Sequence, residues 1–229
     1  MFDLENVIDE VKSLGYSIDT RPYKLNIVGI RNPNISRPEN YEDHIAYFYY
    51  DDRGRLVGKV AEGTTTPSVY WLNAPMNQLG TAILKQGQYV DTYGIGLHRG
   101  KYEALTQNKP VTVIRDNDRN SILNYFAKTS TGLYGINIHR STPVYSDKDL
   151  ISEDSAGCQV FRFRPDFDQM MSFARKSRDL YGNKFTYTLI DQREQLQKER
   201  KKAINYGVIG LVLIGMTGYV YFLSKKLKK

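Results

Sequence analysis

Two kinds of reactive side chain are scarce in this chain of 229 residues, which has one cysteine, Cys158, and three histidines. A single cysteine excludes an internal disulfide. The cysteine and the histidines form no CxxC or HxxxH spacing, so the sequence predicts no zinc site. No other motif indicates a cofactor. Any chemistry therefore has to come from the chain's own side chains.

Acidic residues are also too few to balance the basic ones, since 32 lysines and arginines face 25 aspartates and glutamates, for a net charge of +7. Much of the excess lies in residues 198–229, where only Glu199 is acidic. The rest of the chain is close to neutral. We therefore expect the anionic partner to be a membrane surface rather than a nucleic acid.

Charge is absent from residues 203–224, and the stretch Tyr206–Leu223 is almost continuously apolar. About 20 helical residues cross the hydrocarbon core of a bilayer. Tyrosines near the ends of this stretch and lysines on both sides are typical of membrane interfaces. The sequence predicts a single C-terminal transmembrane helix over 203–224 and a basic tail over 225–229, with a buried soluble helix as the alternative.

The beginning of the chain lacks the pattern of a signal peptide, because Met1–Glu5 is acidic and no uninterrupted apolar stretch follows. Residues 2–14 instead place apolar side chains at helical spacing, so residues 1–20 are predicted to contain an amphipathic helix. Residues 191–202 are polar almost all round and are predicted to form a helical stalk before the membrane span.

Strand patterns dominate residues 21–190, which we interpret as one domain. Ile45–Tyr50 is the strongest strand, and the turn at Asp51–Gly54 leads into its hairpin partner. Asp166–Leu180 has apolar residues at helical spacing, with Pro165 near its start and Gly182 beyond its end. The fold class predicted is mainly β with minor helices, plus the C-terminal transmembrane helix.

The stretch Tyr134–Phe161 contains both the cysteine and one histidine. Ile136 and Ile138 alternate with Asn137 and His139, which is typical of a strand. After a polar loop, Ser155-Ala156-Gly157-Cys158 forms a glycine turn. In such an arrangement a histidine can take the proton of the thiol, and the amides of the turn can point at a developing oxyanion.

These residues resemble the core signature of the L,D-transpeptidase catalytic domain and its phage-borne relatives, which is a strand with histidine, a variable loop and Ser-x-Gly-Cys. The resemblance implies a β-sandwich or barrel that carries out acyl transfer on peptidoglycan. It implies that Cys158 is the nucleophile, that His139 is base and then acid, and that the turn at Gly157 stabilises the oxyanion. Arg140 and Ser155 would bind the substrate. The segment Gly63–Ser68 would lead into the substrate cleft, or be a plain loop.

A second segment, Tyr93–Arg99, shares the pattern Tyr-Gly-Ile-x-x-His-Arg with Tyr134–Arg140. If both segments are strands of one sheet, His98 and His139 share a cleft, and His98 would bind substrate or orient the site. The alternative is a histidine that is only hydrogen-bonded within the structure.

Two departures from the family pattern favour a different function. Ala156 stands where the family usually has a second histidine, and Gln159 stands directly after Cys158. The alternative hypothesis is thus a non-catalytic structural protein of a virion, anchored in a membrane, with a decayed transpeptidase-like site.

Topology favours a virion for either hypothesis. A C-terminal anchor without a signal peptide would leave the domain in the cytoplasm, away from peptidoglycan, whereas a phage virion protein reaches the wall from outside. The expected partners are a lipid membrane, peptidoglycan and other virion proteins.

Overall fold

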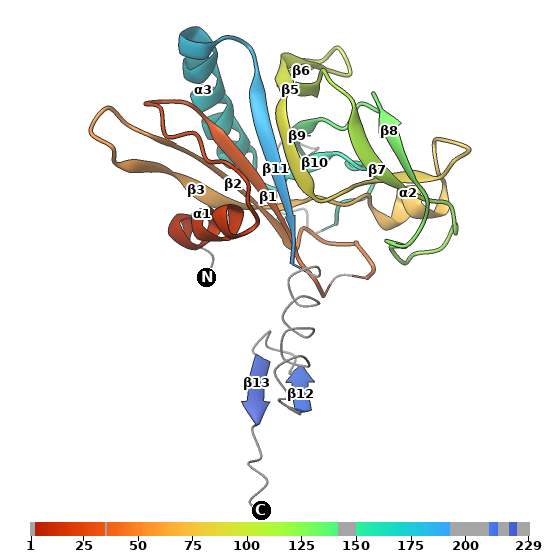
Figure 1. The fold of residues 1–229 in the computed structure, drawn as a ribbon. Coiled ribbons are helices and arrows are strands. Elements are labelled where there is room, and N and C mark those ends of the chain that lie inside the picture. The colour runs from red at the N-terminus through yellow and green to blue at the C-terminus, as the bar shows by residue number, and fades with distance from the viewer. Residues whose placement is uncertain (1–2, 35, 142–149, 193–210, 215–219, 224–229) are drawn as a thin grey trace, which may run out of the picture. The chain divides into compact units, whose positions relative to one another are not determined.

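The computed structural model describes residues 3–34, 36–141, 150–192, 211–214 and 220–223. The chain divides into two compact units, residues 1–191 and residues 192–229. In the first unit eight strands close into a barrel, accompanied by three helices and a separate three-stranded sheet (Figure 1). The prediction of a mainly β fold with minor helices is confirmed.

The barrel brings together strands that are far apart in the sequence. Two neighbouring pairs, β1 with β11 and β9 with β10, are parallel, and the other neighbours are antiparallel. In order round the barrel, the strands are β1 (Asn26–Arg31), β11 (Phe185–Asp191), β5 (Gly87–His98), β6 (Tyr102–Gln107), β9 (Ile138–Arg140), β10 (Gln159–Phe161), β3 (Leu56–Thr64) and β2 (Asp43–Tyr50).

Alternating side chains explain how β2 is buried on both faces. Ile45 and Tyr47 belong to the main core inside the barrel, whereas Ala46 and Phe48 belong to a second core on the outer face. Helix α1 (Leu4–Ser13) covers this outer face with its own apolar stripe of Val7, Ile8 and Val11. The helix predicted near the N-terminus is therefore confirmed, and it packs on the barrel itself.

Helix α3 (Arg164–Tyr181) completes the main core. Its buried residues Phe167, Met170, Met171 and Ala174 recur at helical spacing and pack with side chains from the inside of the barrel. Pro165 stands in the first turn, and the chain leaves the helix at Gly182, whose φ of 84° suits glycine. This confirms the helix predicted over Asp166–Leu180.

A small second sheet lies beside the barrel (Figure 1). It consists of β4 (Thr81–Leu84), β7 (Val111–Asp116) and β8 (Thr129–Gly132), in the order β4-β7-β8. The short helix α2 (Val69–Asn73) packs on it through Leu72, which shares a small core with Ile83 and Ile114.

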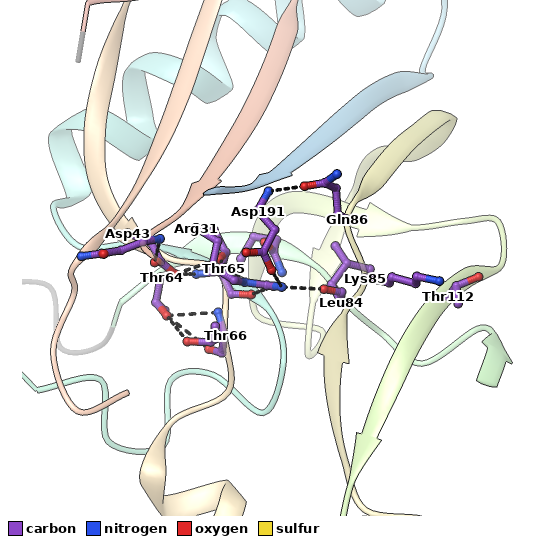
Figure 2. Close-up of polar contacts among 12 residues, drawn as sticks. Arg31, Asp43, Thr64, Thr65, Thr66, Leu84, Lys85, Gln86, Thr112 and Asp191 are labelled. Carbon is purple, nitrogen blue, oxygen red and sulfur yellow. Dashed lines mark hydrogen bonds and ion pairs between the residues drawn. The ribbon is translucent and has the colours of Figure 1, made fainter. Parts of the chain in front are cut away.

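A buried arginine joins the barrel to this second sheet (Figure 2). Arg31 at the end of β1 is 1% exposed; it donates to Thr65 O (2.6 Å), Thr65 Oγ1 (3.1 Å) and Leu84 O (3.0 Å), and it lies 3.4 Å from Asp191 Oδ2. Asp43 accepts the Thr65 hydroxyl and the Thr65 amide, each at 2.7 Å. The ends of β1, β3, β4 and β11 are therefore connected through one guanidinium.

In the second unit the structure describes two antiparallel strands, β12 (Leu211–Ile214) and β13 (Val220–Leu223). Among the described residues, no helix is long and apolar enough to cross a membrane. The rest of the predicted span 203–224, most of the predicted stalk 191–202 and the basic tail 225–229 lie outside the described residues. The membrane helix stays a prediction.

Replacing Arg31 by methionine should lower the free energy of unfolding by roughly 3–5 kcal/mol, because the substitution removes the positive charge that acts on the buried carboxylates of Asp43 and Asp191. Urea unfolding of the full chain, followed by the fluorescence of the single tryptophan, Trp71, measures the change.

Arg178→Met is the matched control, since Arg178 is exposed and pairs with the exposed Asp179. We expect a loss below about 1 kcal/mol for this variant. If both variants lose the same free energy of unfolding, the buried Arg31 stabilises the fold no more than an exposed arginine does.

Candidate functional site

The parallel pairing of β9 and β10 makes the segments that carry the predicted nucleophile and base neighbours in the barrel. His139 is the register partner of Val160, and Cys158 lies two residues before Val160 on the same chain. Because side chains alternate along strands, Cys158 and His139 project from the same face of this pair, opposite to Ile138 and Phe161 in the main core. The two residues lie 19 positions apart in the sequence.

The imidazole of His139 is held at one nitrogen only. Its Nδ1 lies 2.8 Å from Arg140 O and 3.4 Å from the Tyr102 hydroxyl, so we assign the proton to Nδ1. Nε2 is buried and has no hydrogen-bond partner among the described residues. Burial, together with the neighbouring His98, lowers the pKa of His139 to about 3. His139 is therefore a neutral imidazole with an acceptor lone pair on Nε2.

His98 stacks on His139, with 4.0 Å between the ring centroids and 25° between the planes. The side-chain nitrogen Nδ2 of Asn137 lies 3.1 Å from His98 Nδ1 and orients this second ring. Burial, with Arg99 nearby, lowers the pKa of His98 to about 4, so two neutral rings are in contact. The structure places His98 beside the candidate base, where it packs against the ring of His139.

Cys158 is partly exposed at the end of the turn, and its thiol donates to Gly135 O at 3.4 Å. Burial raises the pKa of Cys158, while a backbone hydrogen bond from Asn137 and the charge of Arg99 act in the opposite direction. Cys158 and His139 are thus both neutral, and no hydrogen bond joins them in this structure.

Ser155 holds the turn that presents Cys158. Its side chain is fully buried, and its oxygen lies 2.8 Å from both Thr66 O and Cys158 O while it accepts the Gly157 amide at 3.2 Å. Gly157 has a φ of 122°, and a Cβ there would overlap Ala82 O. Only glycine fits this turn. Ser155, predicted to bind substrate, is placed inside the protein, and the Gly157 amide already has a partner.

Gln159 fixes the same turn from the inside of the barrel. It is fully buried, its Nε2 donates to Gly157 O at 3.1 Å, and its Oε1 accepts the Tyr187 hydroxyl at 2.7 Å. That hydroxyl occupies the space over Gly29, where a Cβ would overlap it. The residue that departs from the family pattern therefore has a defined structural role.

Arg140, also predicted to bind substrate, turns away from this face. Its guanidinium lies 4.3 Å from the centroid of the Tyr102 ring and donates to Ser141 O at 3.3 Å. The segment Gly63–Ser68, predicted to lead into a cleft, is a buried support, because Thr65 contacts Arg31 and Thr66 contacts Ser155.

Asn137, Tyr102 and Arg99 also belong to the site, although the sequence did not predict a role for them. Asn137 projects from the same strand face as His139, two positions before it, and this spacing was a readable signal. Arg99 follows His98 in a tight hairpin with a φ of 50°, so its exposed cation adjoins the site. Among the described residues, no group of histidine, cysteine, aspartate and glutamate could hold a metal ion.

Alkylation by iodoacetamide reports on the site specifically, because Cys158 is the only cysteine. We expect the rate to rise with pH through the range 7–9 without a plateau at lower pH, and to be slower than in the urea-unfolded chain at pH 7. The reason is that burial raises the pKa of the thiol and His139 is neutral.

A preformed thiolate–imidazolium pair would instead alkylate at a nearly constant rate between pH 5 and 7. If the unaltered chain shows such a plateau and His139→Gln does not, Cys158 and His139 are not both neutral at rest.

Acid should destabilise the fold through His139. Its pKa is about 3 in the folded protein and 6.5 in the reference state, so the unfolded chain takes up the proton first as the pH falls. Stability is therefore lost between about pH 6.5 and pH 3, by roughly 1.4 kcal/mol per pH unit. Urea unfolding at pH 4 to 8 should show that the free energy of unfolding depends on pH less steeply in His139→Gln than in the unaltered chain, by this amount. The same dependence on pH in both proteins would refute the lowered pKa of His139.

No protein-family model matches the chain, and neither a curated protein nor a solved structure matches it. The resemblance to L,D-transpeptidases thus rests on the motif residues alone.

Proposed function

We propose that the chain is a cysteine acyltransferase or peptidase in which Cys158 attacks a peptide carbonyl and His139 transfers the proton. One observation supports this proposal above the others. His139 Nε2 is a buried acceptor with no partner among the described residues, while Nδ1 is fixed on Arg140 O. An unpartnered buried acceptor is costly, so its presence on β9, the strand that pairs with the segment directly after Cys158, favours a functional role.

The proposed reaction starts when the Cys158 thiol rotates from Gly135 O towards His139. Nε2 takes the thiol proton as the sulfur attacks the carbonyl carbon, and the imidazolium then protonates the leaving amine. The products of this half-reaction are an acyl thioester on Cys158 and a released amine. A second amine then forms a cross-link, or water completes a cleavage, and either attack regenerates the thiol.

The turn would stabilise the charge that develops on the carbonyl oxygen. Since Gly157 N–H donates to Ser155 Oγ, the Cys158 amide is the donor that we assign to the oxyanion. The cation of Arg99, which lies in the adjoining hairpin, adds positive potential over the same face. These assignments replace the predicted contribution of the Gly157 amide.

The substrate that we propose is the stem peptide of peptidoglycan, and this part of the proposal comes from the resemblance of the motif. The membrane anchor over 203–224 and the place in a phage virion belong to the same proposal. They are supported by the uncharged apolar stretch and its flanking lysines.

A non-catalytic structural role is the second candidate. It is favoured by the partner of the thiol, since Cys158 donates to Gly135 O, and by the burial of His139, which is only 3% exposed. On this account the stacked histidines stabilise the barrel and the protein contributes to a virion as a scaffold.

The test is to incubate the full chain in detergent with purified peptidoglycan and to follow the muropeptides by mass spectrometry. We expect cross-links to appear or disappear with the unaltered chain and no change with Cys158→Ala. His139→Gln should reduce the rate by roughly 10²–10⁴-fold, the usual contribution of a general base.

His44→Gln is the matched control, because His44 lies on β2 outside the site and its loss should leave the rate within about twofold. Identical muropeptides from the unaltered chain and from Cys158→Ala would remove the catalytic proposal and leave the structural role.

A further inference from the structure

A groove of about 240 Å³ lies between α3 and the rim of the barrel, at β6 and β9. Three arginines line it: Arg140 from β9, and Arg164 and Arg175 from α3. Pockets for drug-sized ligands measure roughly 300–1,000 Å³, so this groove suits a smaller group. Glu103 and Asp168 also line it, so the side chains of the lining carry one net positive charge, which favours an anion.

The arginines of the groove differ in how their charges are balanced. Arg164 pairs with Asp168 at 3.1 Å and Arg175 with Glu103 at 3.0 Å, and both pairs are exposed. Exposed pairs of this kind contribute at most about 1 kcal/mol each. Arg140 has no carboxylate partner among the described residues; it lies over the Tyr102 ring. Its guanidinium is the cation that a ligand would neutralise.

The floor of the groove is apolar. Phe167 and Met171 belong to the main core and are 3% and 2% exposed, and the ring of Phe167 meets Tyr102 edge-on, with 6.3 Å between the ring centroids. A guanidinium fork binds a carboxylate in a bidentate manner, and an apolar floor favours a short hydrocarbon substituent next to it. A bare, strongly hydrated anion would gain nothing from this floor.

We propose that this groove binds a small carboxylate with an apolar substituent, of the size of a C-terminal peptide residue, through the guanidinium of Arg140. The groove shares Tyr102 with the Nδ1 side of His139, since the Tyr102 hydroxyl lies 3.4 Å from that nitrogen. Acyl transfer would use Nε2 instead. The binding site is therefore separate from the reacting atoms, and the proposal does not depend on catalysis.

Isothermal titration calorimetry of the full chain in detergent tests the proposal with four probes: N-acetylalanine, N-acetylalaninamide, acetate and inorganic phosphate. We expect N-acetylalanine to bind at least tenfold more tightly than each of the others. The amide lacks the charge, whereas acetate and phosphate lack the apolar substituent.

Two variants locate the binding. Arg140→Gln should weaken N-acetylalanine binding at least tenfold, and Arg140→Lys should restore part of it, because lysine keeps the charge without the fork. Arg178→Gln is the matched control on α3, since Arg178 is not among the residues that line the groove, and it should change the affinity less than twofold.

Three outcomes would overturn the proposal. Equal affinity for N-acetylalanine and its amide would show that the site does not recognise the carboxylate, and this comparison needs no variant. Phosphate binding as tightly as N-acetylalanine would show that the apolar substituent contributes nothing to affinity. Equal weakening by Arg140→Gln and Arg178→Gln would show that the ligand does not bind in the groove.

Discussion

The architecture depends on a charge that is completely removed from water. Arg31 ends β1 inside the protein, and its guanidinium is satisfied by the Thr65 carbonyl and hydroxyl, the Leu84 carbonyl and the Asp191 carboxylate. A buried charge is stable only with its full set of partners, so these groups tolerate little displacement. The arginine therefore holds the barrel and the second sheet in one fixed relation, and the residues that it contacts are themselves part of further contacts (Figure 2).

This constraint extends to the candidate nucleophile through a short chain of hydrogen bonds. Thr65 is fixed by Arg31 and Asp43, the adjacent Thr66 carbonyl contacts the Ser155 hydroxyl, and Ser155 contacts the Cys158 carbonyl. Gln159 fixes the opposite side of the same turn. A turn held from both sides fixes the backbone of Cys158, so that the position of the sulfur is set by rotation of this one side chain.

Local patterns were sufficient to predict much of this fold. Ile45–Tyr50 and the apolar spacing of residues 2–14 identify a strand and a helix, because the periods of 2 and 3.6 are visible in short windows. The parallel pairings of β1 with β11 and β9 with β10 leave no such mark, since register is decided by tertiary packing. The motif could likewise not show that the Cys158 thiol donates to Gly135 O, that Ser155 is buried or that Arg140 lies over Tyr102.

The electrostatics of the site bear on how a neutral thiol and a neutral imidazole could react. Burial disfavours both charged forms, so the pKa of His139 falls while that of Cys158 rises. A low pKa makes the imidazolium a strong acid, which suits protonation of a leaving amine, and makes the imidazole a weak base. Proton removal from Cys158 then has to occur together with attack, when the developing oxyanion places negative charge next to the new imidazolium. In this arrangement the protein holds no thiolate at rest, and in the proposed reaction Cys158 would ionise only when a carbonyl substrate is bound.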